Sequence, residues 1–372
     1  MGSNTILMLG GYGGVGRSIA RLLLKETQVD LVIAGRQKKL SDQFATSLNR
    51  EFSGNRVSSC CADASNRESL LKAFQGVRLV IVLTPTPALI KQIGDAALVS
   101  GCDYLDILVS ESTVRDLDEL ASSIEKQGRI FITQAGFHPG LPAVFVRNGA
   151  QYFDKYEKAV IAMAMNARFE RPEQAAEIIP LISDFSADIC RGGAWRKATY
   201  NDAVTLGMGE RFGTITLFPI QMAEIKLMQE MFNLSETGVY VSGFNWFVDY
   251  LVMPIILITQ KIKKGLATSL LLKLFTWGVN TFSSPYQGVM FMNRAEGWKD
   301  GKKIEVRIIA EHDDAYLFTA IPVVACLKQY FDGGLPSGLW MMGHVVNENV
   351  LFSDMEKMGV RIRTEIGAPC AG

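Results

Sequence analysis

The chain has 372 residues, which at about 150 residues per domain is enough for two or three domains. Its 38 basic and 38 acidic residues cancel and 48% of its residues are hydrophobic, which excludes a disordered chain and argues against a nucleic-acid-binding protein. Six cysteines are too few for a disulfide scaffold, and three scattered histidines do not make a zinc site, so we expect no metal. No basic, apolar leader precedes the first strand-like run, so we expect a cytosolic protein.

Short apolar runs alternate with longer helical periods from residue 1 to about residue 142. The pattern predicts strands at 5–9, 29–34, 56–61, 79–83, 104–108 and 130–134. It predicts helices between them at 16–25, 41–52, 67–74, 88–100 and 114–127. Strands that alternate with helices indicate an α/β fold, here a Rossmann-type doubly wound parallel sheet.

A glycine-rich loop follows the first predicted strand and opens the first predicted helix. Gly11, Gly13 and Gly16 match the G-x-G-x-x-G spacing, in which the glycines permit a tight turn, approach of a pyrophosphate and close helix packing. The helix N-terminus then offers free N–H groups to phosphates. The loop therefore predicts a dinucleotide site; a glycine-rich turn without a ligand is the alternative. The cofactor-binding candidates here are Gly11, Tyr12, Gly13, Gly14, Val15 and Gly16.

The end of the second predicted strand determines which dinucleotide is expected. Sites for NAD place Asp or Glu near this point, whereas this chain has Gly35 and Arg36, followed by Lys38 and Lys39. A guanidinium binds a 2′-phosphate that a carboxylate would repel, so Arg36 and Lys38 predict NADP as the cofactor. The alternative is that Arg36 is a solvated surface charge.

Two further loops lie at the same predicted sheet edge. Asp63 follows the third strand and is a candidate contact to the adenine, although it also suits the cap of the next helix. Thr84 and Pro85 follow the fourth strand, at the carboxyl edge where ligands bind in open α/β sheets. Both loops are therefore cofactor-binding candidates.

The order of four segments resembles the saccharopine dehydrogenase-like family of NAD(P)-dependent oxidoreductases. These segments are the glycine loop, Leu83-Thr84-Pro85, residues 101–106 (GCDYLD) and residues 135–142 (AGFHPGLP). The resemblance implies a Rossmann domain split in sequence, an inserted α+β domain with a mixed sheet, and hydride transfer between NAD(P)H and a carbon. It also implies that the G-x-x-P-G turn beginning at Gly136 leads into the second domain, which makes Gly136 a cofactor-binding candidate.

The expected domains are a nucleotide-binding domain at 1–142 plus 335–372 and a substrate and dimerisation domain at 143–334. The middle domain mixes predicted strands at 156–165, 214–218, 239–242, 289–295 and 303–311 with predicted helices at 172–190 and 315–331. A last helix is predicted at 353–358, within the segment expected to return to the first domain.

Residues 244–288 form an apolar, basic segment. No Asp or Glu occurs from 250 to 295, where Lys261, Lys263, Lys264, Lys273 and Arg294 give a charge of +5. Neither apolar piece reaches the roughly 20 residues that span a bilayer. We therefore predict a pair of basic amphipathic helices that contact a membrane surface. A homodimer interface or a core helix pair lining a substrate tunnel remains open.

Three residues near the expected nicotinamide position are catalytic candidates. His138 lies in the turn after the sixth strand and can titrate near neutrality, although a turn histidine bonded to the backbone is the alternative. Tyr104 and Asp106 end the fifth strand; the alternative for Asp106 is that it holds the loop in place.

The main functional prediction is an NADP-dependent oxidoreductase that reduces a C=C or C=N bond of an apolar or lipid-like small molecule. One alternative is a soluble dehydrogenase of an amino-acid or polyamine-precursor imine adduct. A further alternative is a non-catalytic nucleotide-binding protein on a membrane surface. We expect a homodimer and no nucleic-acid partner.

Overall fold

The computed structural model describes residues 4–166, 168, 175, 186–263, 265–283 and 288–369. The chain divides into two compact units. Unit 1 comprises Met1–Val144 and Tyr316–Gly359, and unit 2 comprises Phe145–Ala315 and Val360–Gly372. Each unit is therefore built from two separate stretches of the chain.

Unit 1 contains a seven-stranded sheet in which all neighbouring strands are parallel. The strands are β1 (Thr5–Leu9), β2 (Asp30–Gly35), β3 (Val57–Cys61), β4 (Leu79–Val82), β5 (Asp103–Asp106), β6 (Ile130–Thr133) and β15 (Gly338–Met341). Their spatial order is β15-β6-β5-β4-β1-β2-β3, so the chain reverses direction across the sheet between β1 and β4. Ligands of open α/β sheets bind at such a switch point, and the prediction of a Rossmann-type sheet is confirmed.

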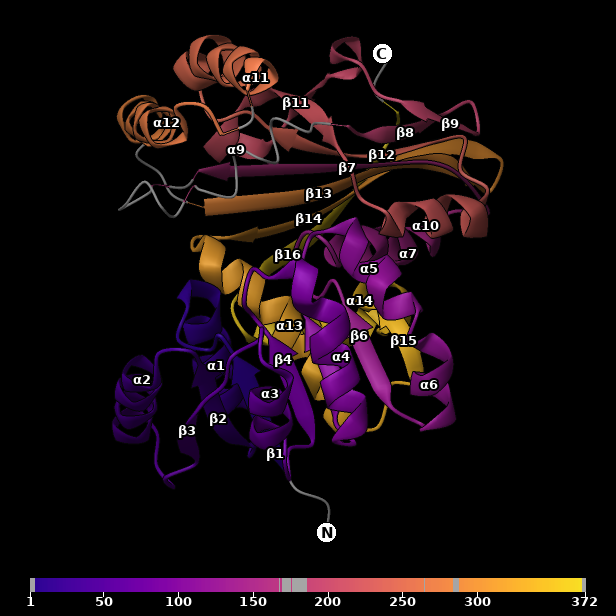
Figure 1. Ribbon diagram of the computed structural model, residues 1–372. Coiled ribbons are helices and arrows are strands. Elements are labelled where there is room, and N and C mark those ends of the chain that lie inside the picture. The colour runs from indigo at the N-terminus through magenta and orange to yellow at the C-terminus, as the bar shows by residue number, and fades with distance from the viewer. Residues whose placement is uncertain are drawn as a thin grey trace. The chain divides into compact units, whose positions relative to one another are not determined.

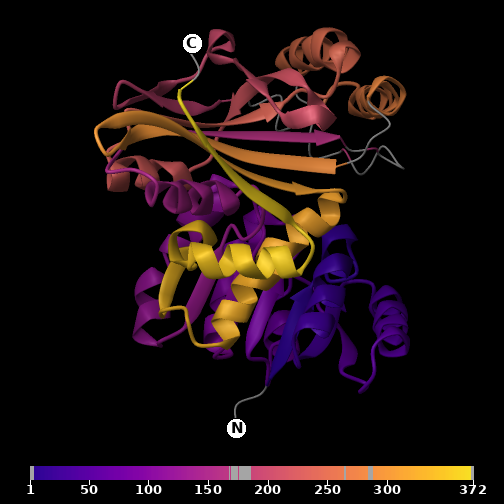
Figure 2. The ribbon, with the colours of Figure 1, turned by 180° about the vertical axis from the view of Figure 1, so that it is seen from behind.

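Helices cover both faces of this sheet. They are α1 (Gly14–Glu26), α2 (Lys38–Glu51), α3 (Arg67–Ala73), α4 (Ile90–Val99), α5 (Glu111–Asp118), α6 (Ala121–Lys126), α13 (Ala315–Phe331), α14 (Met342–Val345) and α15 (Glu348–Lys357), with a 3₁₀ turn, η1, at Pro87–Leu89. Figure 1 shows α3 and α4 on the near face, and Figure 2 shows α13 and α15 on the opposite face. The apolar sides of helices on both faces bury the sheet, which explains why its strands read as continuous apolar runs.

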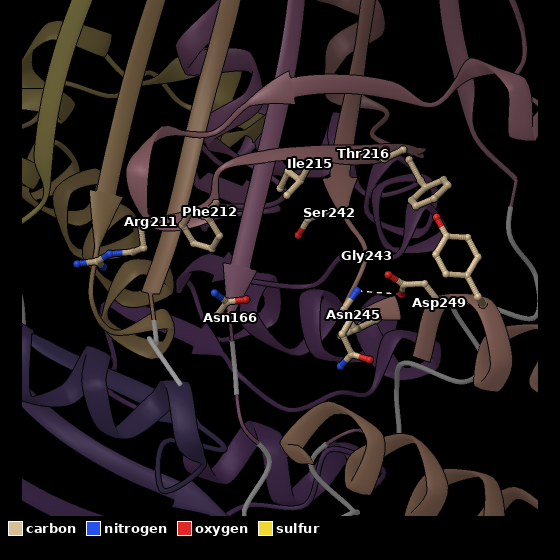
Figure 3. A pocket seen from close by; sticks show the side chains of 12 residues that line it. Asn166, Arg211, Phe212, Ile215, Thr216, Ser242, Gly243, Asn245 and Asp249 are labelled. Carbon is tan, nitrogen blue, oxygen red and sulfur yellow. Dashed lines mark hydrogen bonds between the residues drawn. The ribbon is translucent and has the colours of Figure 1, made fainter. Parts of the chain in front are cut away.

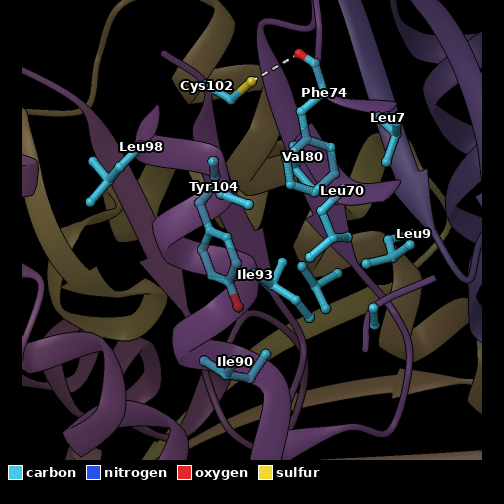
Figure 4. Packing of buried hydrophobic residues seen from close by; sticks show 14 of the residues in the cluster. Leu7, Leu9, Leu70, Phe74, Val80, Ile90, Ile93, Leu98, Cys102 and Tyr104 are labelled. Carbon is cyan, nitrogen blue, oxygen red and sulfur yellow. Dashed lines mark hydrogen bonds between the residues drawn. The ribbon is translucent and has the colours of Figure 1, made fainter. Parts of the chain in front are cut away.

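The core on the α3–α4 side of the sheet joins strand and helix side chains. It includes Leu7, Val80, Ile93 and Phe131, each with no more than 1% of its surface exposed. Tyr104 lies among these side chains in Figure 4, and its ring stacks on Phe131 at a centroid distance of 5.0 Å. Its position in the core bears directly on the catalytic role predicted for it.

Unit 2 is built on a nine-stranded mixed sheet, as expected for the inserted α+β domain. Its strands are β7 (Lys155–Asn166), β8 (Asp188–Arg191), β9 (Ala194–Lys197), β10 (Val204–Gly207), β11 (Thr214–Ile220), β12 (Glu236–Ser242), β13 (Gly288–Lys299), β14 (Lys302–His312) and β16 (Arg361–Gly367). The main order is β10-β11-β12-β7-β13-β14-β16, and β8 pairs with β12 and β9. The β12–β7 pair is parallel and the other pairs are antiparallel.

Short and long helices accompany this sheet. They are α7 (Leu141–Ala150), which begins in unit 1, α9 (Gly209–Phe212), α10 (Glu224–Phe232), α11 (Met253–Ile262) and α12 (Thr268–Phe282), with a 3₁₀ turn, η3 (Tyr200–Asp202), and a π-helical turn, η4 (Val248–Val252). The helix predicted at 172–190 is wrong at its end, because Asp188–Arg191 pairs with β9 and β12 as strand β8. Most of the rest of that prediction lies outside the described residues.

The structure has the second boundary between the units at Ala315 and Tyr316, whereas the sequence predicted it between residues 334 and 335. Helix α13 belongs to unit 1, and it is followed by β15, which pairs with β6 as expected for the returning segment. The chain then leaves unit 1 again, because β16 pairs with β14 of unit 2 along its whole length. Pairing between strands about 50 residues apart leaves no local signal in the sequence, which explains the error.

Candidate functional site

The glycine loop in unit 1 makes a close turn between β1 and α1. A Cβ on Gly16 would lie 2.7 Å from the carbonyl oxygen of Gly11, so any larger residue would push the helix away from the loop. Gly13 is the N-cap of α1, and neither a side-chain cap nor an acidic residue occupies the first turn. The first amides of a helix have no intrahelical acceptor, so this end of α1 is suited to bind phosphate.

Tyr12 explains why no acidic residue ends β2. A Cβ on Gly35 would lie 2.5 Å from Cε1 of the Tyr12 ring, so the tyrosine occupies the place that a side chain at position 35 would need. Arg36 follows directly and is exposed. The end of β2 thus presents a guanidinium to solvent, as a 2′-phosphate site requires.

Arg17 is a second guanidinium beside the loop that the sequence pattern did not single out. Its Nε donates to the Tyr12 carbonyl at 2.8 Å, and its guanidinium lies 4.7 Å from the centre of the Phe44 ring. Lys38, in contrast, is paired with Asp42 and lies 3.4 Å from the Ser59 hydroxyl. Among the two predicted phosphate ligands, Arg36 is therefore the less encumbered group.

Asp63 forms hydrogen bonds within its own loop. Its Oδ1 accepts hydrogen bonds from the Ser65 amide at 2.9 Å and the Ser65 hydroxyl at 2.8 Å. These bonds, with a smaller effect of the nearby Arg36 charge, lower the pKa of Asp63. The N-cap of the next helix, α3, is Asn66 and not Asp63. The Asn66 side chain accepts a hydrogen bond from the Ser69 amide. A contact from Asp63 to adenine stays a prediction.

The loop after β4 lies beside the glycine loop. A Cβ on Gly10 would lie 2.7 Å from the Thr84 methyl carbon, and the Thr84 and Thr86 hydroxyls are 3.0 Å apart. Pro85 is exposed between them. The structure thus brings the loops after β1, β2 and β4 to one edge of the sheet, with the predicted cofactor residues from Gly11 to Pro85 along it.

The turn from Gly136 to Leu141 is tight because its glycines have positive φ angles. Gly136 has φ 156° and Gly140 has φ 119°, and a Cβ on Gly140 would lie 2.6 Å from the Gly136 carbonyl oxygen. His138 lies in this turn with its ring centre 3.9 Å from that of Phe137. Its Nδ1 is buried and has no hydrogen-bond partner in the described part of the chain.

His138 is consequently a neutral imidazole at physiological pH. Burial lowers its pKa to about 4, since a charged ring would lose its hydration. Nδ1 makes no bond to the backbone of the described residues, so the alternative of a turn histidine bonded to the backbone stays a prediction for Nε2. A group with this pKa is almost entirely deprotonated at pH 7, so His138 is poorly suited to act as a general acid.

Tyr104 and Asp106 have no exposed surface, and their contacts describe a structural pair. The Tyr104 hydroxyl donates to Asp106 Oδ2 at 2.9 Å, while the amides of Leu108 and Gln134 donate to Asp106 Oδ1 at 3.0 and 3.2 Å. Burial raises the pKa of both groups. The geometry favours the alternative that Asp106 holds the loop, and a catalytic role for these two residues stays a prediction.

Helix α13 contributes contacts to the site that sequence reasoning missed. A Cβ on Gly14 would lie 3.0 Å from Cε1 of Tyr316, and a Cβ on Gly136 would lie 4.0 Å from the Thr319 methyl carbon. The first turn of α13 therefore runs between the glycine loop and the turn that contains His138. Tyr316 is about 300 residues from the glycine loop in the sequence, so only the folding of unit 1 shows that the two lie together.

Unit 2 contains a cavity of about 300 Å³ at the ends of β7, β11 and β12. Figure 3 shows Arg211 on one side and Asp249 on the other, with Asn166 and Asn245 nearby. Its remaining lining residues are Phe212, Ile215, Thr216, Phe218, Ser242, Gly243, Phe244 and Tyr250. The cavity thus combines an apolar wall with hydroxyl, amide and guanidinium groups.

Arg211, on one side of this cavity, belongs to a network of ion pairs. Arg211 donates to Asp313 Oδ1 at 2.6 Å, and Arg361 donates to the same oxygen at 3.0 Å. These bonds lower the pKa of Asp313 to about 2, so one ionised carboxylate faces two guanidinium groups. In the described part of the chain, no cluster of three or more His, Cys, Asp or Glu could hold a metal ion.

Comparisons with known proteins address the family and the fold. Residues 6–132 match the family model described as "Saccharopine dehydrogenase NADP binding domain". The saccharopine dehydrogenase (L-Glu forming) of Saccharomyces cerevisiae is similar over 98% of this chain and 100% of its own, with 13% identity and a TM-score of 0.70. The DAP dehydrogenase of C. glutamicum is similar over 96% of this chain and 99% of its own, with 13% identity and a TM-score of 0.51. No curated protein sequence matches the chain.

Proposed function

Because residues 6–132 form a domain of the saccharopine dehydrogenase NADP-binding family, we propose that this chain is an NADP-dependent dehydrogenase of an amino-acid-type substrate. The family match confirms the predicted family, the cofactor NADP and the class of NAD(P)-dependent oxidoreductase. The substrate class is the new part of the proposal, and it follows the amino-acid alternative rather than the apolar or lipid-like reading.

The residues of unit 1 fit NADP at the edge of the parallel sheet. The free amides at the start of α1 would bind the pyrophosphate, and the absence of a Cβ on Gly13 would leave room for it. Arg36 would bind the 2′-phosphate, with Arg17 adding positive charge nearby. When bound, NADPH supplies a hydride, and the protein's contribution is to position the reacting carbon atoms.

The polar cavity of unit 2 is the observation that carries the substrate class. Its volume of about 300 Å³ suits a small molecule, and Arg211 and Asn166 offer groups that bind carboxylate and amino substituents. A lipid-like substrate would need a mostly apolar lining. The two similar solved structures also bear the names of dehydrogenases that act on saccharopine and on DAP, which supports the same class.

The proposed reaction breaks a C–H bond next to nitrogen and forms a C=N bond, while NADP⁺ accepts the hydride; the reverse direction consumes NADPH. The nitrogen-bound proton passes to water, because the lowered pKa of about 4 makes the His138 imidazole a weak base. Catalysis then depends on the positioning of the reacting carbon atoms, and His138 contributes an uncharged ring to the site.

A substrate screen tests this proposal. NADP⁺ reduction would be followed by nicotinamide absorbance with saccharopine, DAP and free amino acids, and NADPH oxidation with apolar enones. We expect turnover with an amino-acid-type compound. Arg211→Gln should raise KM about tenfold, since it removes a charge-assisted carboxylate contact. Arg196→Gln is the matched control, because Arg196 pairs with Asp202 away from the cavity.

Two results would contradict the proposal. Turnover of apolar enones alone would restore the lipid-like reading. Tight NADPH binding without turnover of any compound in either group would favour the non-catalytic alternative.

A further inference from the structure

Helices α11 and α12 form a hairpin with its own small core. We call residues 246–282 the α11–α12 hairpin; Figures 1 and 2 both show its two helices side by side. Its inward-facing side chains pack together as Val248, Val252, Ile256, Leu271, Phe275 and Val279, each no more than 4% exposed. This internal cluster uses one face of each helix, so packing does not require the other faces to be apolar.

The outward faces are nevertheless apolar. Ile258 is 62% exposed, Ile262 is 75% exposed and Leu270 is 67% exposed. Leu251, Ile255, Leu257 and Leu266 are each more than 40% exposed. Within α11 only Thr259, Gln260 and Lys261 are polar. A helix that is apolar around its circumference is normally buried, so this surface is built to be covered.

Aromatic side chains gather at one end of the same surface. Trp246 is 59% exposed and Trp277 is 53% exposed, and both pack on Phe282, at ring-centre distances of 5.3 and 5.6 Å. Tryptophan prefers the boundary between water and hydrocarbon, because its ring is apolar and its N–H is polar. This cluster therefore suits the headgroup level of a membrane.

The charge of the hairpin has one sign. Lys261, Lys263 and Lys273 are exposed, and no Asp or Glu occurs between residues 250 and 295. Asp249, at the start of the hairpin, is turned inward and accepts a hydrogen bond from the Phe244 amide at 2.9 Å. In a chain with no net charge, this local excess of lysine matches an anionic surface.

We propose that the α11–α12 hairpin docks unit 2 on an anionic lipid surface. The helices of 10 and 15 residues are about 15 and 22 Å long, too short for a hydrocarbon layer of about 30 Å. None of the described helices is long and apolar enough to cross a membrane. The hairpin therefore lies in the plane of the interface, with its isoleucines and leucines in the acyl region and its lysines among the headgroups.

A second copy of the chain is a poorer occupant. A symmetric dimer through this surface would bring the lysines of two hairpins together, and the one carboxylate of each hairpin, Asp249, is turned inward to the Phe244 amide. The substrate-tunnel alternative from the sequence also fits poorly, because these apolar side chains face solvent.

Vesicle flotation of the full chain tests the proposal. One set of vesicles contains phosphatidylcholine alone, and the other contains equal parts of phosphatidylcholine and phosphatidylglycerol. We expect the wild-type protein to float with the anionic vesicles only, and to be released by high salt, which screens the lysines. Ile258→Glu with Ile262→Glu should reduce the bound fraction about tenfold or more. Met231→Glu, at an equally exposed apolar position of α10, is the matched control.

Charge variants keep the test valid if the isoleucine variant does not fold. Lys261→Glu with Lys273→Glu should also abolish flotation with anionic vesicles, whereas Lys302→Glu, at the exposed start of β14, should not. A far-UV circular dichroism spectrum and a melting curve like those of the wild-type protein show that each variant is folded, and both are independent of the substrate proposed above. Failure of the wild-type protein to float, or flotation unaffected by both hairpin variants, would overturn the proposal. Loss of a dimer in the isoleucine variant without any wild-type flotation would assign the surface to self-association instead.

Discussion

Asp106 joins two segments of unit 1 through one buried carboxylate. It accepts from the Leu108 amide next to it and from the Gln134 amide, 28 residues away, while Tyr104 binds its second oxygen. A buried acceptor with three donors is costly to remove, because each donor then loses its partner in a place that water does not reach. At the scale of the residue, Asp106 therefore acts on stability.

Substitution of Asp106 should separate this structural role from catalysis. Asp106→Ala should lower the free energy of unfolding by about 2–4 kcal/mol, since it leaves two amides and a hydroxyl unsatisfied. Asp106→Asn keeps an acceptor for the amides and should cost about 1 kcal/mol or less. Urea unfolding measures both values. An Asp106→Asn protein of normal stability that binds NADPH but shows no turnover would contradict the structural assignment.

His138 makes a prediction about pH. Its folded-state pKa of about 4 lies below the ordinary value of 6.5, so the unfolded chain binds the proton more tightly. The stability that the neutral ring provides is complete above about pH 6.5 and is lost as the pH falls toward 4. The loss should reach about 3 kcal/mol at most.

Urea unfolding of the wild-type protein and of His138→Gln across this pH range checks the prediction. The difference between the two proteins should shrink as the pH falls. An imidazole NMR signal of His138 that titrates near pH 6.5 would contradict it.

At the scale of the element, Gly13 and Gly16 have different roles in the turn between β1 and α1. Gly16 faces the backbone of Gly11, whereas a Cβ on Gly13 would meet only the Gly10 carbonyl oxygen, at 3.3 Å. Gly16→Ala should therefore destabilise the protein by about 1–3 kcal/mol through overpacking. Gly13→Ala should leave stability nearly unchanged and raise the NADPH Kd about tenfold, because the new methyl group enters the phosphate-binding space.

Thermal unfolding and nicotinamide fluorescence distinguish the two glycine variants. Equal effects of the two substitutions on stability and on NADPH binding would contradict these separate roles of Gly13 and Gly16.

Periodicity predicts where the strands and helices of the first 142 residues lie. It does not predict what the individual side chains within them contact. Most strands there are apolar and bounded by loops, so their existence is visible locally, whereas β3 (VSSCC) and β5 (DYLD) contain polar residues. The sequence of β5 does not reveal which way Tyr104 points, so its buried hydrogen bond to Asp106 could not be predicted. Arg17 and Tyr316 reach the glycine loop from helices, and only their packing brings them there.

At the scale of the whole molecule, the chain passes between the two units three times. The last passage, at Gly359, was not predicted, because β16 finds its partner β14 about 50 residues back in the sequence. Its ion pairs, including Arg363 with Glu311 at 2.5 Å, also lie within unit 2. The last residues therefore support unit 2 and leave the nucleotide-binding unit complete without them.

Truncation after Gly359 tests this division. Because the glycine loop, Arg36 and Tyr316 all remain in unit 1, the NADPH Kd should change less than about threefold, by the usual additivity of distant sites. The melting temperature should fall, since β14 loses its neighbour. Loss of NADPH binding in a soluble truncated protein would instead support the boundary expected from the sequence, with 335–372 wholly in the nucleotide-binding domain.

The preference for NADPH over NADH, and its dependence on Arg36, is the property that defines the proposed cofactor site. Fluorescence titration with NADPH and NADH would be made on the wild-type protein, on Arg36→Glu and on Arg50→Glu, an exposed charge at the other end of α2. We predict that NADPH binds the wild-type protein at least about tenfold more tightly than NADH, that Arg36→Glu removes this preference, and that Arg50→Glu retains it. Equal affinity for the two nucleotides, or no effect of Arg36→Glu, would contradict the assigned site.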